Sequence, residues 1–210
     1  MDLFDQTPEL ADLPYEKVKA SAEKCSKCQL AKGRNKVVFG NGPVPCDLML
    51  IGEAPGADED EQGLPFVGRA GKLLTLILES VNIKRPDDIY IANTVKCRPP
   101  KNRAPLPKEQ DACRPYLQAQ IKLVDQKIIL LAGAPAVKAI LKSSEPMSKI
   151  RGKWTKLPGT DISVMPIFHH AYLLRNPQKT KGSPKWLTWQ DMHEIRHALD
   201  YHKKVKELSS

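Results

Sequence analysis

Four short apolar runs are spaced along the chain, each bounded by glycine, proline or polar residues. Runs of this length and setting predict buried β-strands. They cover residues 47–52, 88–92, 127–132 and 162–168. Pro166 lies inside the last run and cannot donate a ladder hydrogen bond, which predicts an edge position or a bulge there.

Helical periodicity fills the segments between and around these runs. Apolar residues recur there three and four positions apart, which predicts amphipathic helices. The expected helices run from Tyr15, over 68–82, from Leu106, after Gly133 and from Pro184. The alternation of strands and helices predicts an α/β fold, with three αβα layers around a central four-stranded, mainly parallel sheet.

Size and charge narrow the class of protein. The 210 residues show no repeat or composition break, so we expect one domain over 1–210, with a short N-terminal arm over 1–13 and a polar tail after Tyr201. No apolar run approaches a membrane span and no signal-peptide pattern begins the chain, which favours a soluble, intracellular protein with no membrane partner. The net charge of +9 favours a polyanionic partner, nucleic acid first; the alternative is a basic protein without one.

Candidate functional side chains follow the predicted strands. The first strand leads into a loop rich in glycine, proline and carboxylates that carries one large aromatic, Phe66. Asn93 follows the second strand and His169 the fourth. Because open α/β sheets bind ligands at the carboxyl ends of their strands, we expect one shared site. The simpler alternatives are a solvated acidic turn, a turn asparagine and a structural histidine. The loop matches neither a dinucleotide-binding nor a P-loop pattern.

Four of the five cysteines form a metal-binding pattern. Cys25 and Cys28 make a CxxC pair, and Cys97 and Cys113 lie far downstream, so the four converge only through tertiary folding. In a chain without a secretion signal, metal binding is favoured over disulfides. Four thiolates suit zinc or an iron–sulfur cluster, and the spacing alone does not choose between them. Cys46 is expected to be a small buried residue.

Three segments resemble the family 4, iron–sulfur uracil-DNA glycosylases. Residues 52–74, GEAPGADEDEQGLPFVGRAGKLL, resemble the first active-site motif of that family, and residues 169–177, HHAYLLRNP, resemble the second. One position departs, since His170 stands where the family usually has proline. KCRPP at 96–100 with a later cysteine resembles the family's cluster-binding pattern. The resemblance implies the uracil-DNA glycosylase fold and a monofunctional DNA-repair hydrolase, which excises uracil and leaves an abasic site.

The resemblance also implies roles for individual residues. Phe66 would stack on a flipped-out uracil, Asn93 would hydrogen-bond its polar edge, and His169 would donate to a carbonyl oxygen of the leaving base. Glu53 and Glu59 match motif carboxylates, and which group activates the water stays open. Backbone groups in the loop are further expected to position the water or the uracil; the residues assigned to substrate binding in this way are Gly52, Ala54 and Gly56.

The same resemblance assigns the cysteines and the partner. Cys25, Cys28, Cys97 and Cys113 would hold one structural 4Fe–4S cluster, with zinc as the alternative. The partner would be uracil-containing DNA, bound by a monomeric, cytoplasmic, nucleoid-associated prokaryotic protein. Leu173, Leu174 and Arg175 would fill the vacated base stack, with at least one leucine expected in the core.

Two other functions stay open at this point. One is a non-catalytic or covalent uracil-DNA-binding protein that traps the sugar on a histidine after the second strand. Residues 101–108 contain no histidine, which argues against such a trap. The other is a zinc-stabilised nucleic-acid-binding module without catalysis.

Overall fold

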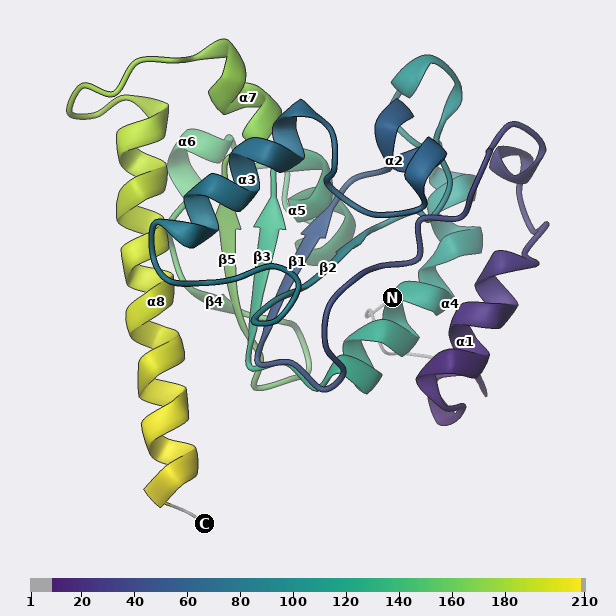
Figure 1. Ribbon diagram of the computed structural model, residues 1–210, viewed down its shortest axis with the longest axis horizontal. Helices are drawn as coiled ribbons and strands as arrows, with labels where there is room; N and C mark the ends of the chain where they lie inside the picture. Colours follow the sequence, from purple (N-terminus) through teal and green to yellow (C-terminus); the bar gives the residue numbers. More distant parts are fainter. Residues whose placement is uncertain (1–8, 209–210) are drawn as a thin grey trace.

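A five-stranded sheet forms the centre of the molecule in the computed structural model, which describes residues 9–208. The strand order is β2-β1-β3-β5-β4, and all neighbours are parallel except β4 and β5 (Figure 1). The strands are β1 (Leu48–Gly52), β2 (Tyr90–Asn93), β3 (Ile128–Ala132), β4 (Thr155–Lys156) and β5 (Ser163–Ile167).

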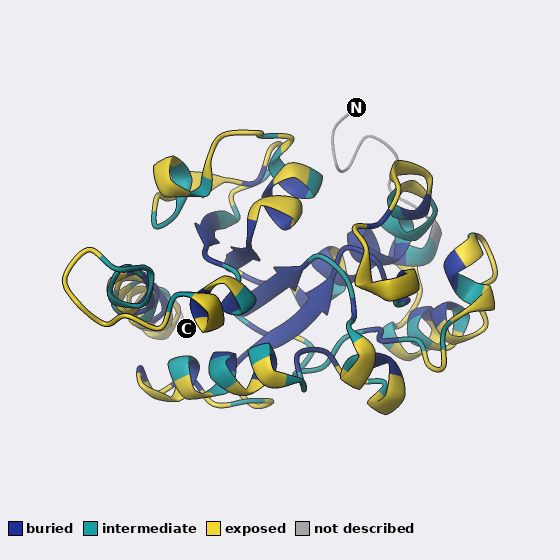
Figure 2. Cartoon of the chain, turned by 90° about the horizontal axis from the view of Figure 1, so that it is seen from above, coloured by how far each residue is buried: buried dark blue, intermediate teal, exposed yellow. Residues whose placement is uncertain are grey.

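Helices cover both faces of this sheet, so the predicted three-layer αβα architecture is confirmed. The longer helices are α1 (Tyr15–Glu23), α3 (Arg69–Glu79), α4 (Pro107–Val124), α5 (Ala134–Leu141) and α8 (Pro184–Leu208). The shorter ones are α2 (Ala57–Gln62), α6 (Met147–Ile150), α7 (His170–Arg175), and the 3₁₀ segments η1 (Glu9–Asp12), η2 (Gln29–Lys32) and η3 (Pro100–Asn102). Seen from above, the dark-blue buried strands lie between helices whose outer faces are exposed (Figure 2).

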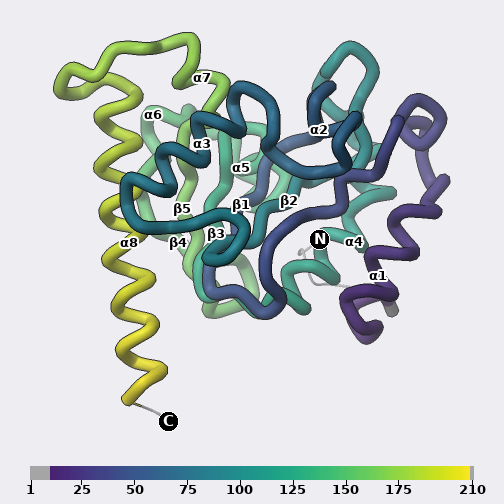
Figure 3. The backbone as a smooth tube through the Cα atoms, viewed as in Figure 1, coloured from purple at the N-terminus to yellow at the C-terminus, as the bar shows by residue number. Residues whose placement is uncertain are grey.

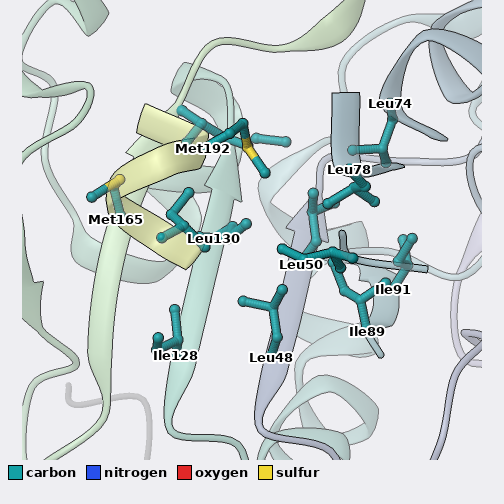
Figure 4. Close-up of a cluster of buried hydrophobic side chains, with 14 of the residues drawn as sticks. Leu48, Leu50, Leu74, Leu78, Ile89, Ile91, Ile128, Leu130, Met165 and Met192 are labelled. Atoms are coloured by element: carbon teal, nitrogen blue, oxygen red, sulfur yellow. The ribbon is translucent and has the colours of Figure 1, made fainter. Parts of the chain in front are cut away.

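Alternation along each strand divides the core into two halves. On β1, Leu48 and Leu50 face the side covered by α3 and α8, where they pack with Leu78 and Met192 (Figure 4). The intervening Met49 and Ile51 face α4 and α5 on the other side. All five residues of β1 and of β3 are buried, as expected for parallel strands covered on both faces.

The fifth strand is a correction to the predicted four. Thr155 and Lys156 are exposed and polar, so this two-residue strand carries no hydrophobic signal. It pairs only with the start of β5, at Ser163 and Val164. Pro166 therefore has a strand partner on the β3 side only, and its carbonyl accepts a hydrogen bond from the Gly152 amide instead. Because proline has no N–H to donate to a second neighbouring strand, it is suited to this edge position.

Three other segments differ from their predictions or extend them. The acidic loop after β1 contains the short helix α2, which its polar sequence conceals. The tail after Tyr201 was expected to be frayed, but α8 continues through it to Leu208. Of the predicted N-terminal arm, η1 docks on α4 through buried Ala11, and residues 1–8 lie outside the described part. Between residues 9 and 208 no helix is long and apolar enough to cross a membrane.

The N-terminal segment forms a separate small layer beside α4. Helix α1 packs on α4, and the chain then passes through the cysteine-containing turn towards β1 (Figure 3). Val18 and Ala22 of α1 pack with Phe39 and Tyr116 in a core cluster of their own. This places Cys25 and Cys28, at the end of α1, close to Cys113 on α4.

Candidate active site

The carboxyl ends of the parallel strands open into a cleft of about 800 Å³. This volume lies in the range of small-molecule binding sites. The cleft brings together most of the residues that the sequence pointed to: Glu53, Ala54, Gly56, Glu59, Phe66, Asn93, His169 and Arg175. The predicted convergence of the acidic loop, Asn93 and His169 at one edge of the sheet is therefore observed.

Asn93 lies at the bottom of this cleft with an unsatisfied acceptor. It is the last residue of β2, directly opposite Gly52 in the register with β1. Its side chain is buried, and its Oδ1 atom has no hydrogen-bond partner among the described residues. Buried carbonyl oxygens in native proteins are normally paired, so an open acceptor in a cleft indicates a place for a ligand donor.

Gly52 makes room for Asn93 and Phe66 to meet. A Cβ atom at position 52 would lie 2.4 Å from Asn93 Oδ1 and 2.7 Å from Phe66 Cζ. Both distances are shorter than real Cβ contacts, so a side chain at Gly52 would push one of the two groups away. The glycine is thus required by the close approach of an amide and a ring at the base of the cleft.

Phe66 is held in a strained backbone conformation by hydrogen bonds from both sides. Its φ angle of 52° lies in the left-handed region, which costs about 1–3 kcal/mol for a non-glycine residue. Arg85 donates to the carbonyls of Pro65 (2.8 Å) and Phe66 (2.9 Å). Glu59 accepts from the amides of the next two residues, Val67 and Gly68, both at 2.9 Å. These contacts fix the ring over the cleft at the expense of local strain.

The two candidate carboxylates have different surroundings. Glu59 also accepts from the Gly56 amide at 3.0 Å, so its carboxylate is bonded to three backbone N–H groups. Glu53 lines the cleft half-buried, and no hydrogen bond or ion pair within residues 9–208 engages its carboxylate. Burial raises the pKa of Glu53 above its ordinary value. Of the two, Glu53 is the one free to act as a base.

His169 presents one defined nitrogen to the cleft. It caps the N-terminus of α7, where its Nδ1 accepts a hydrogen bond from the Ala171 amide at 3.1 Å. A neutral imidazole that accepts at Nδ1 carries its proton on Nε2. Burial lowers the pKa of His169, and the positive charge of Arg175 lowers it further, whereas Glu59 opposes the shift. The side chain is therefore a neutral Nε2–H donor near neutral pH.

His170 occupies the first position of α7, next to the aromatic platform. Proline is well tolerated at the first position of a helix, so the same backbone conformation can accommodate histidine here and the proline usual in the family. The His170 ring is fully buried and meets Phe66 edge-on, with ring centroids 6.1 Å apart. Burial lowers the pKa of His170 to about 3, and His169 and Arg85 add to the shift. His170 thus stays uncharged.

Helix α7 separates the three predicted DNA contacts. Leu173 is fully buried, so it is core, and its assignment as a DNA-contact residue is wrong. Leu174 and Arg175 are exposed, and Arg175 lines the cleft. One leucine in the core is the outcome that the sequence led us to expect, because adjacent helix positions point in different directions.

The four predicted metal-binding cysteines line one small pocket beside the cleft: Cys25, Cys28, Cys97 and Cys113. Within residues 9–208, no carboxylate or histidine lines it, whereas three cations do, namely Lys27, Arg34 and Lys96. Cys46 lies elsewhere, buried with its thiol donating to the Leu48 carbonyl, as expected.

The chemistry of this pocket fits a metal group bound by thiolates. Soft thiolates bind zinc as well as iron–sulfur clusters, and the surrounding cations suit either anionic group. No three His, Cys, Asp or Glu side chains within residues 9–208 are arranged to hold a single ion.

Comparison with known proteins agrees with this site. Residues 39–193 match the model of the uracil DNA glycosylase superfamily. The chain is 43% identical over 169 residues to a type-4 uracil-DNA glycosylase of Thermotoga maritima, covering 80% of this chain and 85% of the relative. It is 41% identical over 173 residues to one of Sulfurisphaera tokodaii (79% and 78%). It is 40% identical over 182 residues to one of Saccharolobus solfataricus (84% and 82%). This chain belongs to the type-4 uracil-DNA glycosylases.

Two residues of this type-4 uracil-DNA glycosylase were not found from its sequence. Arg85 clamps the Phe66 turn from a loop beyond α3, at a sequence distance that no local pattern reveals. Lys96 is buried and donates to the Asn93 carbonyl at 2.7 Å. Lysine is almost never fully buried, so nothing in the local sequence indicated this position.

Proposed function

We propose that this chain removes uracil from DNA by hydrolysing the N-glycosidic bond and leaves an abasic site. The observation that carries this proposal is the buried, unpaired Asn93 Oδ1 at the bottom of the cleft, beside the clamped Phe66 ring. A base can reach this position only after it is flipped out of the helix. A flipped pyrimidine would lie on Phe66 with its polar edge towards Asn93.

The open acceptor explains a preference for uracil over cytosine. Uracil has a hydrogen on N3 that can donate to Asn93 Oδ1, whereas cytosine has only an acceptor at N3 and would leave the amide oxygen unpaired. A site built to hydrogen-bond its substrate rejects an analogue without the partner by up to ~10⁴–10⁵-fold. Selection by this amide therefore protects the normal cytosines of DNA.

The cleft also supplies groups for the chemical step. The His169 Nε2–H would donate to a uracil carbonyl as the leaving base gains negative charge, and one such donor typically contributes ~10²–10³-fold in rate. Glu53 would orient and deprotonate the attacking water. Glu59 serves as a positioning residue, because three backbone amides occupy its carboxylate. No lysine is found among the described residues that line the cleft, which supports hydrolysis without a Schiff-base strand-cleaving step.

We further propose that the four cysteines hold one 4Fe–4S cluster, with zinc as the alternative. When bound, the cluster would join the turn after α1 to the loop after β2 and to α4, which carry its ligands. Its contribution is then structural: it fixes the segment that follows Asn93.

Exposed residues above the cleft would hold the DNA. Leu174 and Arg175 are exposed and would fill the gap left by the flipped base, and the exposed Lys179 and Lys181 follow on the loop towards α8. Arg103 would contribute little, since Glu109 binds its guanidinium at 2.8 Å. Action as a monomer on the DNA of a prokaryotic nucleoid completes the proposal.

A single incubation tests the function. The protein is mixed with an oligonucleotide carrying one uracil, and with matched thymine and cytosine oligonucleotides, before treatment with alkali. We expect cleavage at the uracil only, and only after alkali. Strand breaks before alkali would contradict a monofunctional reaction, and absence of cleavage after alkali would reject the glycosylase proposal.

A further inference from the structure

Lys96 lies between the cysteine pocket and the base-reading asparagine. It follows the end of β2 by three residues and is 2% exposed. Its Nζ donates to the main-chain carbonyl of Asn93 at 2.7 Å, while its backbone amide donates to Cys113 Sγ at 3.3 Å. One residue thus touches both the strand end that carries Asn93 and a predicted cluster ligand.

The buried ammonium of Lys96 has no carboxylate partner. No Asp or Glu within residues 9–208 forms an ion pair with it, and the Phe39 ring faces it at 5.9 Å from the centroid. The thiols of Cys97 and Cys113 line the same pocket as Lys96, and Cys113 Sγ accepts the hydrogen bond from the Lys96 amide. A buried cation without an anion is strongly unfavourable. Metal-bound thiolates would supply the missing negative charge.

We propose that Lys96 is a positioning residue that couples the cysteine site to uracil recognition. The negative charge of the cluster-bound thiolates holds the ammonium in the interior, and the ammonium holds the Asn93 carbonyl through a hydrogen bond. The backbone of Asn93 is thereby fixed, so that its side-chain amide meets the uracil edge. This inference rests on the proposed function, because it concerns the same base-binding site.

Two neutral variants and a matched control test the coupling. Lys96→Met removes both the charge and the donor, whereas Lys96→Gln keeps a donor without the charge. Lys27→Met removes a cation from the exposed side of the same pocket. The Lys27 ammonium lies over the Tyr116 ring and makes no hydrogen bond to Asn93. For each protein we would measure iron content, the rate of iron release to a chelator, and single-turnover excision of uracil.

If the Lys96 ammonium and the thiolates stabilise each other, both Lys96 variants should release iron faster than Lys27→Met and wild type. If the hydrogen bond from Lys96 Nζ positions Asn93, excision should be slower by at least about tenfold in Lys96→Met, which is the loss expected for one charge-assisted hydrogen bond. Lys96→Gln should lose less, because it retains a donor. Iron release and excision rates equal to wild type in Lys96→Met would overturn the inference.

A double-mutant cycle separates positioning from general destabilisation. If Lys96 acts through Asn93, Lys96→Met should have little further effect on excision in the Asn93→Ala background. Full additivity of the two losses would overturn the coupling. If Lys96→Met does not fold, Lys96→Gln carries the same comparisons. An inactive wild type would reject the proposed function, whereas an active wild type with unaffected Lys96 variants would reject only this inference.

Discussion

Replacing Gly52 with alanine should damage the base-binding site while leaving the fold in place. The added Cβ would lie 2.4 Å from Asn93 Oδ1 and 2.7 Å from Phe66 Cζ. Carbon contacts are favourable at about 3.5–4.0 Å, so the ring or the amide must move by roughly 1 Å. The backbone at Gly52 is not in the left-handed region, so alanine adds a steric conflict and no backbone strain.

The magnitude follows from the role of the two displaced groups. A misplacement of about 1 Å in a catalytic site can slow a reaction ~10²-fold, equivalent to about 2.7 kcal/mol of transition-state stabilisation. Overpacking costs about 1–3 kcal/mol of folding stability. A chain of this length loses roughly 2–4 °C in Tm for each kcal/mol, so the folded protein should remain the main species at room temperature.

Single-turnover excision kinetics and thermal unfolding followed by circular dichroism measure both effects. Gly33→Ala is the matched control, since a Cβ there meets nothing within 4 Å. We expect Gly33→Ala to behave as wild type and Gly52→Ala to lose activity far beyond its loss of stability. A Gly52→Ala rate close to wild type would refute the assignment of Gly52, Asn93 and Phe66 to one tightly packed site.

Four further predictions address the remaining groups. Burial raises the pKa of Glu53, so the excision rate should fall as the pH drops through that raised value. Glu53→Gln should lose ~10²–10⁴-fold in rate and should no longer show this pH dependence. A series of excision rates against pH measures both effects. Glu59→Gln should instead lower Tm, because it weakens three backbone hydrogen bonds. Equal Tm values for Glu53→Gln and Glu59→Gln would contradict this difference. His169→Ala should slow excision ~10²–10³-fold, whereas Tm should fall only by the small amount expected for a lost helix cap, and a rate near wild type would remove His169 as the donor. Cys113→Ala should lose iron and brown colour, while Cys46→Ala should retain both; a colourless, zinc-containing wild type would contradict the cluster.

The sequence predicted those features that depend on local patterns. Strand runs and helical periodicity located the layers, and the rule that ligands bind at strand carboxyl ends located the cleft around Asn93 and His169. The polar strand β4 and the short helix α2 were missed because neither has a hydrophobic repeat. Leu173 illustrates the limit of motif reasoning, since only the orientation of α7 decides which motif residues face solvent.

The parts that the sequence could not predict are contacts between distant segments. Arg85 reaches the Phe66 turn, and Glu59 holds its other side, so the strained platform depends on two residues that no spacing rule connects. Glu59 was predicted alongside Glu53 as a catalytic carboxylate, and only the hydrogen bonds to three amides distinguish a positioning role from a free one. In both cases the sequence does not reveal which distant groups the side chain contacts.

The most direct test of base recognition by Asn93 is the single-turnover rate of uracil release by wild type and by Asn93→Ala, on oligonucleotides that differ only in uracil or cytosine. We expect free uracil and an abasic site with wild type, no reaction at cytosine, and a loss of about 100-fold or more in the variant. Release of both bases at similar rates, or an Asn93→Ala rate equal to wild type, would contradict base recognition by Asn93.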